Sequence, residues 1–433
     1  MDWLVVAIFC IAFYALIAGY IKYNSIWAEH ITFYGPILAV KTDRVDFFDV
    51  FRSYSRFFRL YGSFGAILVV VISVIMSVLL IFGFYKTIQS PPPPDGIYEI
   101  QNILAIPGVN EFIPLTFAVL IGLFLTLVVH EFGHAILCRV EDIKVKSTGI
   151  LIAVVPIGAF VEPDEDEVQK ASRRSKIRMY GAGIVNNLVV ALVCLVILIF
   201  LMGMAMPNSV PMIHGVYKGY PAEMAGIPPD SLISSINEVP VESVEEIGRI
   251  LEKSLPGEEI SMTTIYRREQ HRYTLTLAEW PEDLDPWATS GFMGISYYTP
   301  SATKEVFDRF IAGPVGPLFL LYLPINSVIE GDSLQMAILA FDTNYAAVWD
   351  VPFNGFWGVV QIVFWTFWFN LAVGTFNALP LIPLDGGYIM QEGITGIFER
   401  RGRADLAHYV VTAISTGMIA IIVLLIAVPH ILG

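Results

Sequence analysis

Six long apolar runs constrain the fold of this chain more than any other feature. They lie near residues 3–21, 64–85, 112–138, 178–206, 356–380 and 407–431. At about 1.5 Å per helical residue, each run is long enough to cross about 30 Å of hydrocarbon. A mean hydropathy of +0.64 and a hydrophobic share of 55% are typical of membrane proteins. We therefore expect a polytopic α-helical membrane protein with about six transmembrane helices in a lipid bilayer.

The basic residues predict which loops face the cytoplasm. They concentrate in segments 22–62 and 139–177 and directly after the fifth run, whereas segment 87–111 has none. By the positive-inside rule, the basic segments are cytoplasmic and segment 87–111 is external. The net charge of −14 comes without a basic stripe, so we expect no nucleic acid partner.

The third run contains His130-Glu131-Phe132-Gly133-His134. Residues four apart share one face of a helix, so both imidazoles can reach one Zn²⁺ with Glu131 beside the metal's open position. Each such polar side chain costs roughly 2–3 kcal/mol in a membrane helix, so these residues persist where they pair or bind something. The pattern predicts a zinc site that activates water. An inactive relative and a proton or ion pathway are the alternatives.

A catalytic zinc usually has three protein ligands and one position for water. The candidate for the third ligand is Asp385, at the cytoplasmic end of the fifth run; an ordinary turn residue before two glycines is the alternative. The three cysteines lack paired spacing, so a thiolate site is not expected. A membrane protease of another HExxH type would need a Glu on a downstream helix, and no second apolar helix offers one suitably placed.

Residues 207–300 differ from the rest because charged residues return and apolar residues alternate with strand period. Segment 219–241 resembles the PDZ pattern, with departures at Tyr220 and Pro229. We expect a small PDZ-like α+β domain outside the membrane, which either binds peptides or filters substrates by size. Segment 301–355 follows, and we expect its apolar stretch 310–325, interrupted by glycines and prolines, to be a re-entrant or interfacial connector.

The HExxH run, the segment Asn-Ala-Leu-Pro-Leu-Ile-Pro-Leu-Asp-Gly-Gly at 377–387 and the PDZ-like insertion together resemble the site-2 protease family of intramembrane zinc metalloproteases. The resemblance covers most of residues 112–431. It implies that His130, His134 and Asp385 ligate zinc, that Glu131 is the general base, and that the substrate is a transmembrane helix of another protein.

The resemblance also divides the chain into regions. It implies a catalytic membrane core made of residues 112–206 and 356–433. Residues 1–100 fall outside the resemblance, and we expect residues 1–111 to form an N-terminal membrane anchor region with two spans.

Two further segments fit this resemblance. Segment 149–161 is apolar, rich in β-branched residues and too short to span as a helix, and it resembles the family's re-entrant β-hairpin. Its edge could hold an unwound substrate through Ile157, Gly158 and Phe160; a buried connector strand is the alternative.

Asparagines on the apolar runs are the remaining candidates. The resemblance implies that Asn186, and in the same way Asn377, holds the substrate backbone or the oxyanion. For Asn187 and Asn370 we expect helix packing.

The function that these observations favour is that of a zinc metalloendopeptidase that hydrolyses peptide bonds within or near transmembrane helices. We expect an integral protein of a prokaryotic cell membrane, with its active site toward the cytoplasm and its PDZ-like domain outside. The alternative is a catalytically inactive membrane scaffold that uses the PDZ-like domain to hold partner tails.

Overall fold

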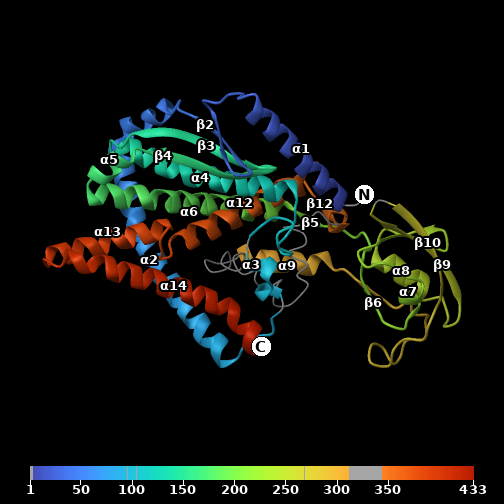
Figure 1. Cartoon of the computed structure of the whole chain (residues 1–433). Helices are drawn as coiled ribbons and strands as arrows, with labels where there is room; N and C mark the ends of the chain where they lie inside the picture. Colours follow the sequence, from blue (N-terminus) through green and yellow to red (C-terminus); the bar gives the residue numbers. More distant parts are fainter. Residues whose placement is uncertain (1–2, 95, 104, 268, 312–343) are drawn as a thin grey trace. The chain divides into compact units, whose positions relative to one another are not determined.

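The computed structural model describes residues 3–94, 96–103, 105–267, 269–311 and 344–433. The chain forms two compact units, one of residues 1–195 with 362–433 and one of residues 196–361. Figure 1 shows the order of the elements along the chain. The connector predicted at 310–325 falls outside the described residues from 312 onward.

Five helices in the described part of the chain are long and apolar enough to cross a membrane. They are α2 (Ser55–Gln89, after the 3-10 helix η1, Asp46–Tyr54), α4 (Phe117–Val140), α6 (Arg173–Met204), α12 (Phe356–Asn377) and α14 (Ala404–Leu432). On α2, the side chains of Phe64 and Ile67 are 65% and 66% exposed, as expected of a helix whose solvent is lipid. The expectation of a polytopic helical membrane protein is confirmed.

The remaining predicted run, 3–21, forms the helix α1 (Trp3–Tyr23). Of this helix, Ile11–Tyr23 is found as a shorter apolar helix and not as a candidate span. Among the residues that the structure describes, five of the six expected spans are therefore found by length and composition. Short elements connect the long ones: η2 (Gly96–Tyr98), α3 (Ile100–Ile103), α5 (Glu165–Lys170) and α13 (Asp385–Arg400).

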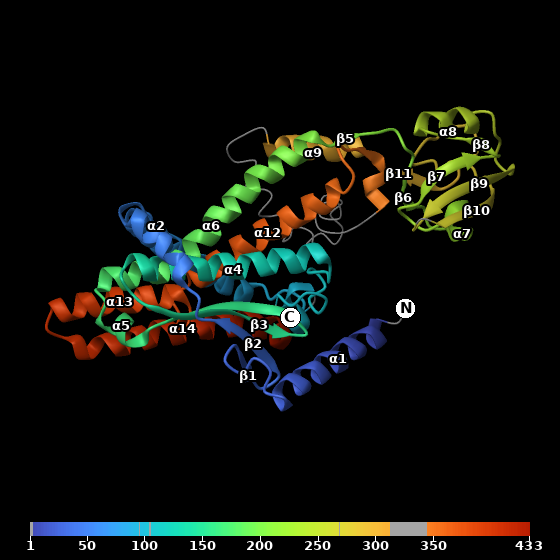
Figure 2. The ribbon, with the colours of Figure 1, turned by 90° about the horizontal axis from the view of Figure 1, so that it is seen from above.

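The predicted β-hairpin is part of a four-stranded antiparallel sheet. The strands are β1 (Ile31–Tyr34), β2 (Ile37–Thr42), β3 (Val145–Ala153) and β4 (Val155–Pro163), in the order β1-β2-β3-β4. Gly149 allows β2 to approach β3, because a Cβ there would lie 2.3 Å from the Val40 carbonyl oxygen. The Tyr14 hydroxyl of α1 donates to the Ile152 carbonyl at 2.9 Å. The N-terminal region thus covers β3, which Figure 2 shows beside β2, while β4 lies at the edge of the sheet and contacts α4 (Figure 1).

Glycines set the distance between the long helices of this unit. A Cβ on Gly133 of α4 would lie 2.5 Å from the Ala182 carbonyl oxygen of α6, and one on Gly65 of α2 would lie 2.4 Å from the Val185 side chain. Small residues at such crossings let membrane helices pack backbone to backbone, where dispersion is the main attraction. These contacts bring α2, α4 and α6 together.

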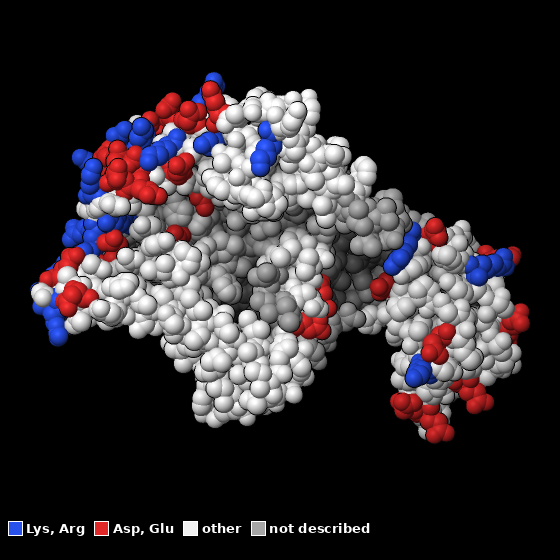
Figure 3. All heavy atoms as spheres, viewed as in Figure 1, with Lys and Arg blue, Asp and Glu red and all other residues white. Residues whose placement is uncertain are grey.

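Two clusters of ion pairs hold the charged ends of these helices. Glu141, just after α4, has a side chain only 6% exposed and accepts hydrogen bonds from Arg178 and Ser175 of α6 at 2.9 and 2.7 Å. Arg173 of α6 pairs with Glu392 and Glu399 of α13 at 3.3 and 2.9 Å. Figure 3 shows charged side chains gathered at the end of this unit where α5 and α13 lie, while its long helices present an uncharged surface.

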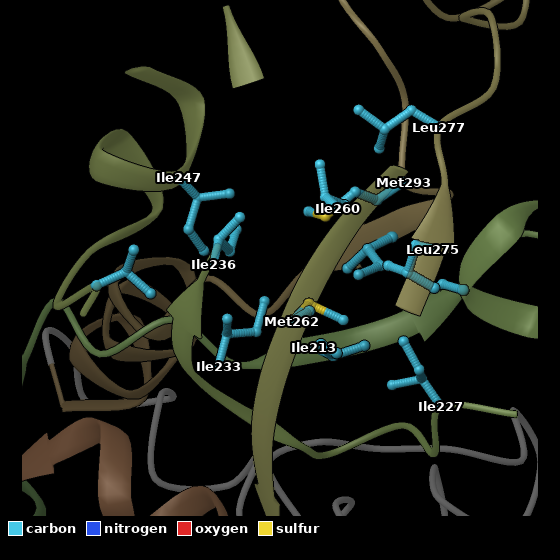
Figure 4. Close-up of a cluster of buried hydrophobic side chains, with 13 residues drawn as sticks. Ile213, Ile227, Ile233, Ile236, Ile247, Ile260, Met262, Leu275, Leu277 and Met293 are labelled. Atoms are coloured by element: carbon cyan, nitrogen blue, oxygen red, sulfur yellow. The ribbon is translucent and has the colours of Figure 1, made fainter. Parts of the chain in front are cut away.

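The second unit contains the α+β domain expected at 207–300. Its elements are β6 (Ile213–Val216), α7 (Pro221–Met224), β7 (Leu232–Ile236), β8 (Val239–Pro240), α8 (Val244–Leu251), β9 (Glu259–Tyr266), β10 (Glu269–Thr276) and β11 (Ile295–Tyr297). One sheet has the order β10-β9-β7-β8, and β6 pairs with β11. Figure 4 shows their inward side chains, among them Ile233 and Met262, in one buried cluster.

The same unit has four further elements: β5 (Met206–Pro207), α9 (Pro300–Ile311), the 3-10 helix η4 (Asn344–Val348) and β12 (Trp349–Asp350). β5 pairs with β12, so the chain leaving α6 is joined to the chain that precedes α12.

We predict that Glu141→Ala destabilises the protein, because it leaves Arg178 without its buried carboxylate. Breaking a fully buried pair costs about 3–5 kcal/mol, and the 23% exposure of Arg178 reduces this to about 2 kcal/mol. Thermal unfolding in detergent measures the effect. Asp142→Asn is the control: its pair with Arg52 is exposed and its positive φ of 62° suits Asn, so we expect less than about 1 kcal/mol. Equal stability of Glu141→Ala and wild type would contradict this account of the cluster.

Candidate metal centre

Three ligand-type atoms from α4 and α13 form a nearly equilateral triangle. His130 Nε2 lies 3.2 Å from His134 Nε2 and 3.2 Å from Asp385 Oδ2, and His134 Nε2 lies 3.3 Å from the same Asp385 oxygen. Tetrahedral ligands at about 2.0–2.1 Å from a zinc ion are about 3.3 Å apart from one another. The spacing therefore fits one ion bound by all three residues, and their role as ligands stays a prediction.

The surroundings of Asp385 also fit a cation. Its Oδ2 atom is buried and has no hydrogen-bond partner, although two imidazole nitrogens lie close to it. Burying a carboxylate oxygen without a partner is costly, and a cation in the triangle would remove that cost. Among the described residues, His130, His134 and Asp385 are the one group of three or more such side chains found close enough to share a metal ion.

The loop before α13 explains why Asp385 is followed by two glycines. A Cβ on Gly386 would lie 2.3 Å from the Ala378 carbonyl oxygen, and one on Gly387 would lie 2.3 Å from the Leu381 carbonyl oxygen. The loop therefore folds directly onto the first turn of α13. This close packing holds Asp385, the first residue of the helix, toward α4.

A third glycine, Gly183 of α6, leaves room for the triangle. A Cβ there would lie 2.5 Å from His134 Nε2 and 2.9 Å from His130 Nε2. Any larger residue at this position would push into the space that a metal and its water need. The sequence analysis did not single out Gly183, although its place among small residues at 181–183 was a usable signal.

The second nitrogen of His134 has a partner that fixes the ring. His134 Nδ1 lies 2.9 Å from the Met179 carbonyl oxygen of α6. A carbonyl oxygen can only accept, so Nδ1 carries the hydrogen and the Nε2 lone pair points into the triangle. This is the arrangement that a metal-binding imidazole needs.

Glu131 connects the triangle to the β-hairpin. Its Oε2 atom accepts a hydrogen bond of 2.9 Å from the Val161 N–H of β4. The predicted contact residue Phe160 is the neighbour of Val161, and Gly158 and Ile157 follow toward the hairpin turn. The structure therefore brings this edge strand to the acidic residue beside the triangle.

The predicted asparagines lie in different places. Asn186 Oδ1 accepts from the Tyr61 hydroxyl at 2.7 Å, and its Nδ2 donates to the Val129 carbonyl at 3.3 Å. Asn377 ends α12 and is half-buried. Asn370 donates to Thr126 Oγ1 at 2.8 Å and so joins α12 to α4.

Asn187, which the sequence analysis assigned to helix packing, is the asparagine that touches a residue of the triangle. It is fully buried, and its Nδ2 atom lies 3.3 Å from His130 Nδ1. The sequence could not rank the two neighbours, because the rotation of α6 decides which of them meets the His130 ring.

Comparison with known proteins gives the family. The model of peptidase family M50 matches residues 118–425. This chain belongs to peptidase family M50. The resemblance to site-2 proteases seen in the sequence is confirmed, and the matched region begins at residue 118.

Three curated relatives show how far the similarity extends. An uncharacterized protein of Methanocaldococcus jannaschii is 24% identical over 66% of this chain and 59% of its own length. The probable protease eep of Enterococcus faecalis is 22% identical over 61% of each chain. A putative zinc metalloprotease of Clostridium acetobutylicum is 22% identical over 61% of this chain and 81% of its own length. The matched region thus spans about three fifths of the first two relatives.

We predict that Gly183→Ala removes bound metal without unfolding the protein, because the new Cβ occupies the space beside both imidazole nitrogens. Metal analysis of the purified protein gives the readout. Gly181→Ala is the matched control on the same helix, because a Cβ there has no neighbour closer than 3.7 Å. Full metal content in the Gly183→Ala protein would contradict the role of this glycine.

Proposed function

We propose that this protein is an intramembrane zinc metalloendopeptidase whose substrates are transmembrane segments of other membrane proteins. The triangle of His130, His134 and Asp385, with Glu131 beside it on a candidate membrane span, carries the proposal. Membership of peptidase family M50 and the relative named as a putative zinc metalloprotease support it.

In this mechanism, the zinc would supply Lewis-acid chemistry, which polarises a peptide carbonyl and makes a water molecule more acidic. Glu131 takes the proton from the attacking water and returns it to the leaving amine. Its Oε2 atom is held by the Val161 N–H, so the carboxylate keeps a fixed orientation while Oε1 is free to exchange the proton. One water is consumed for each peptide bond, and the products are a carboxylate and an amine.

The free edge of β4 is the proposed holder of the unwound substrate. Val161 is opposite Thr148 and Ala159 is opposite Ile150, so their N–H groups point to the same side, away from β3. The Val161 group reaches Glu131, which leaves Ala159 to bind a substrate carbonyl by β-augmentation. Ile157 lies at a register shift and has no partner in β3, so this residue bends the strand.

Side chains along β4 and two asparagines complete the proposed substrate site. Ile157, which is 41% exposed, is available for contact with a substrate. We assign Asn377 and Asn186 to the substrate backbone or the oxyanion, as the family resemblance implies. Because Asn186 is bonded to Tyr61 and Val129, it can do this only by exchanging those bonds.

The membrane arrangement follows the distribution of basic residues. We assign α1 as a sixth span and the β3–β4 hairpin as re-entrant, with the metal site toward the cytoplasm of a prokaryotic cell. The domain of residues 207–300 is then external, residues 301–355 connect it to the membrane core, and residues 1–111 anchor the chain. The ion-pair clusters near α5 and α13 support a cytoplasmic location for that end of the first unit.

A groove in the second unit supports a docking role for the PDZ-like domain. A cavity of about 220 Å³ is lined by Val244, Gly248 and Leu251 of α8 and by residues around Phe292 and Ile295. A mostly apolar slot between a helix and a strand suits an extended apolar peptide. An inactive scaffold would use the same groove to bind its partners. Measurements of metal content and of proteolysis distinguish the scaffold from the protease.

We predict that Glu131→Gln keeps the metal but lowers the cleavage rate by roughly 10²–10⁴-fold, because the glutamine amide cannot act as a base. His134→Ala and Asp385→Ala are expected to lose the metal as well. The measurement combines metal analysis with cleavage of a model transmembrane substrate in detergent or liposomes. Substantial proteolysis by the Glu131→Gln protein would sink the assignment of the base.

We predict that Ala159→Pro slows cleavage at least tenfold with unchanged metal content, because proline removes the edge N–H. Ala159→Val is the control, since it keeps the N–H and adds only side-chain bulk. Substrates with Gly or Asn near the scissile bond should be cleaved faster than Leu-rich ones, because their helices unwind more easily. Equal rates for the Pro and Val variants would leave the edge without a role.

A further inference from the structure

Asn187 lies on the buried side of His130, opposite the metal triangle. There, Asn187 Nδ2 lies 3.3 Å from His130 Nδ1, while Asn187 Oδ1 is buried with no hydrogen-bond partner. Asn187 has an exposed fraction of 0%. The side chain therefore cannot find its partners in solvent, and its hydrogen bonds must be made inside the protein.

The chemistry of the pair decides which amide atom faces the ring. If His130 Nε2 gives its lone pair to a metal, Nδ1 carries the hydrogen and can only donate. An amide nitrogen can also only donate, so the arrangement pairs two donors and leaves one acceptor alone. The two arms of an amide are similar in size, and a half-turn about χ2 places Oδ1 against Nδ1. That single rotation gives His130 an acceptor and gives the orphan oxygen a donor.

We infer that Asn187 is a positioning residue for the metal site, whose Oδ1 accepts the hydrogen bond from His130 Nδ1 and holds the metal-binding tautomer. The inference rests on the proposed metal function. It assigns Asn187 a role that differs from that of its neighbour Asn186.

The spacing along α6 supports this assignment. Met179, Gly183 and Asn187 are four residues apart, so they lie on one face of the helix. Met179 O binds Nδ1 of His134, Gly183 leaves room at both Nε2 atoms, and Asn187 meets Nδ1 of His130. Three successive turns on one face of α6 thus contact the two histidines of α4.

Helix α12 also packs against α6 at Asn187. A Cβ on Gly374 would lie 3.4 Å from the Asn187 Cβ. Asn370, one turn earlier on the same face, also has a buried Oδ1 atom without a partner. After the half-turn, the Asn187 amide nitrogen faces away from His130 and needs an acceptor. The unpartnered Asn370 oxygen is an acceptor on this face of α12.

A packing role alone is the competing explanation, and two substitutions separate the two. Asn187→Leu keeps the branched shape of the side chain, with the same number of heavy atoms, but cannot accept a hydrogen bond. Asn187→Asp keeps the acceptor and forms a carboxylate–histidine pair of the kind that supports metal sites. Asn186→Leu is the matched control, because it removes the neighbouring amide, which contacts Tyr61 and Val129.

The experiment measures zinc dissociation constants of the purified full-length protein by competition with a chelator, together with the visible absorption spectrum of the cobalt(II) form. We expect Asn187→Leu to weaken zinc by about 10–100-fold and to change the cobalt spectrum, whereas Asn187→Asp and Asn186→Leu stay within about threefold of wild type. If Asn187→Leu does not fold, Asn187→Ala, which removes the acceptor without added bulk, is held to the same limits.

Two outcomes would overturn the inference while the metal function stands: wild-type affinity in the variant without an acceptor, or an Asp variant as weak as the Leu variant. Absence of zinc from the wild-type protein would instead overturn the proposed function. The two failures are therefore distinguishable.

Discussion

The close approach of α4 and α6 is the constraint on which the site depends. Gly133 lets the two helices touch backbone to backbone, and Gly183 keeps the space beside both imidazoles open. In a membrane, helices gain little from hydrophobic burial, so small residues and polar contacts determine how they pack. The buried carboxylate of Glu141 then ties the end of α4 to Arg178 of α6. Metal binding and helix packing are therefore properties of the same interface.

The contact between Glu131 and Val161 links the proposed chemistry to the proposed substrate site. The carboxylate of Glu131, the proposed base, is oriented by the Val161 N–H of the edge strand. An unwound peptide that pairs with β4 would thus be aligned with the base and the metal triangle at once. A transmembrane helix must give up its internal hydrogen bonds to react, and each exposed backbone group costs several kcal/mol in lipid unless it finds a partner. The strand edge can provide such partners.

The sequence predicted the large features because they are recorded in local patterns. The lengths of the apolar runs predicted the five candidate spans that are found, and the alternation of apolar and polar residues predicted strands in the α+β domain. The spacing of His130 and His134 placed both on one face, and the two glycines after Asp385 marked a tight turn. Tertiary contacts had no such signal: the role of Gly183 depends on which face of α6 meets α4. The same helix rotation places Asn187, and not Asn186, against His130.

X-ray absorption at the zinc edge measures whether His130, His134 and Asp385 bind one zinc ion. For the purified wild-type protein, the account predicts nitrogen and oxygen ligands at about 2.0–2.1 Å with the signature of two imidazoles, and no sulfur at about 2.3 Å. A sulfur shell, a single imidazole, or an unchanged spectrum in the Asp385→Ala protein would contradict it.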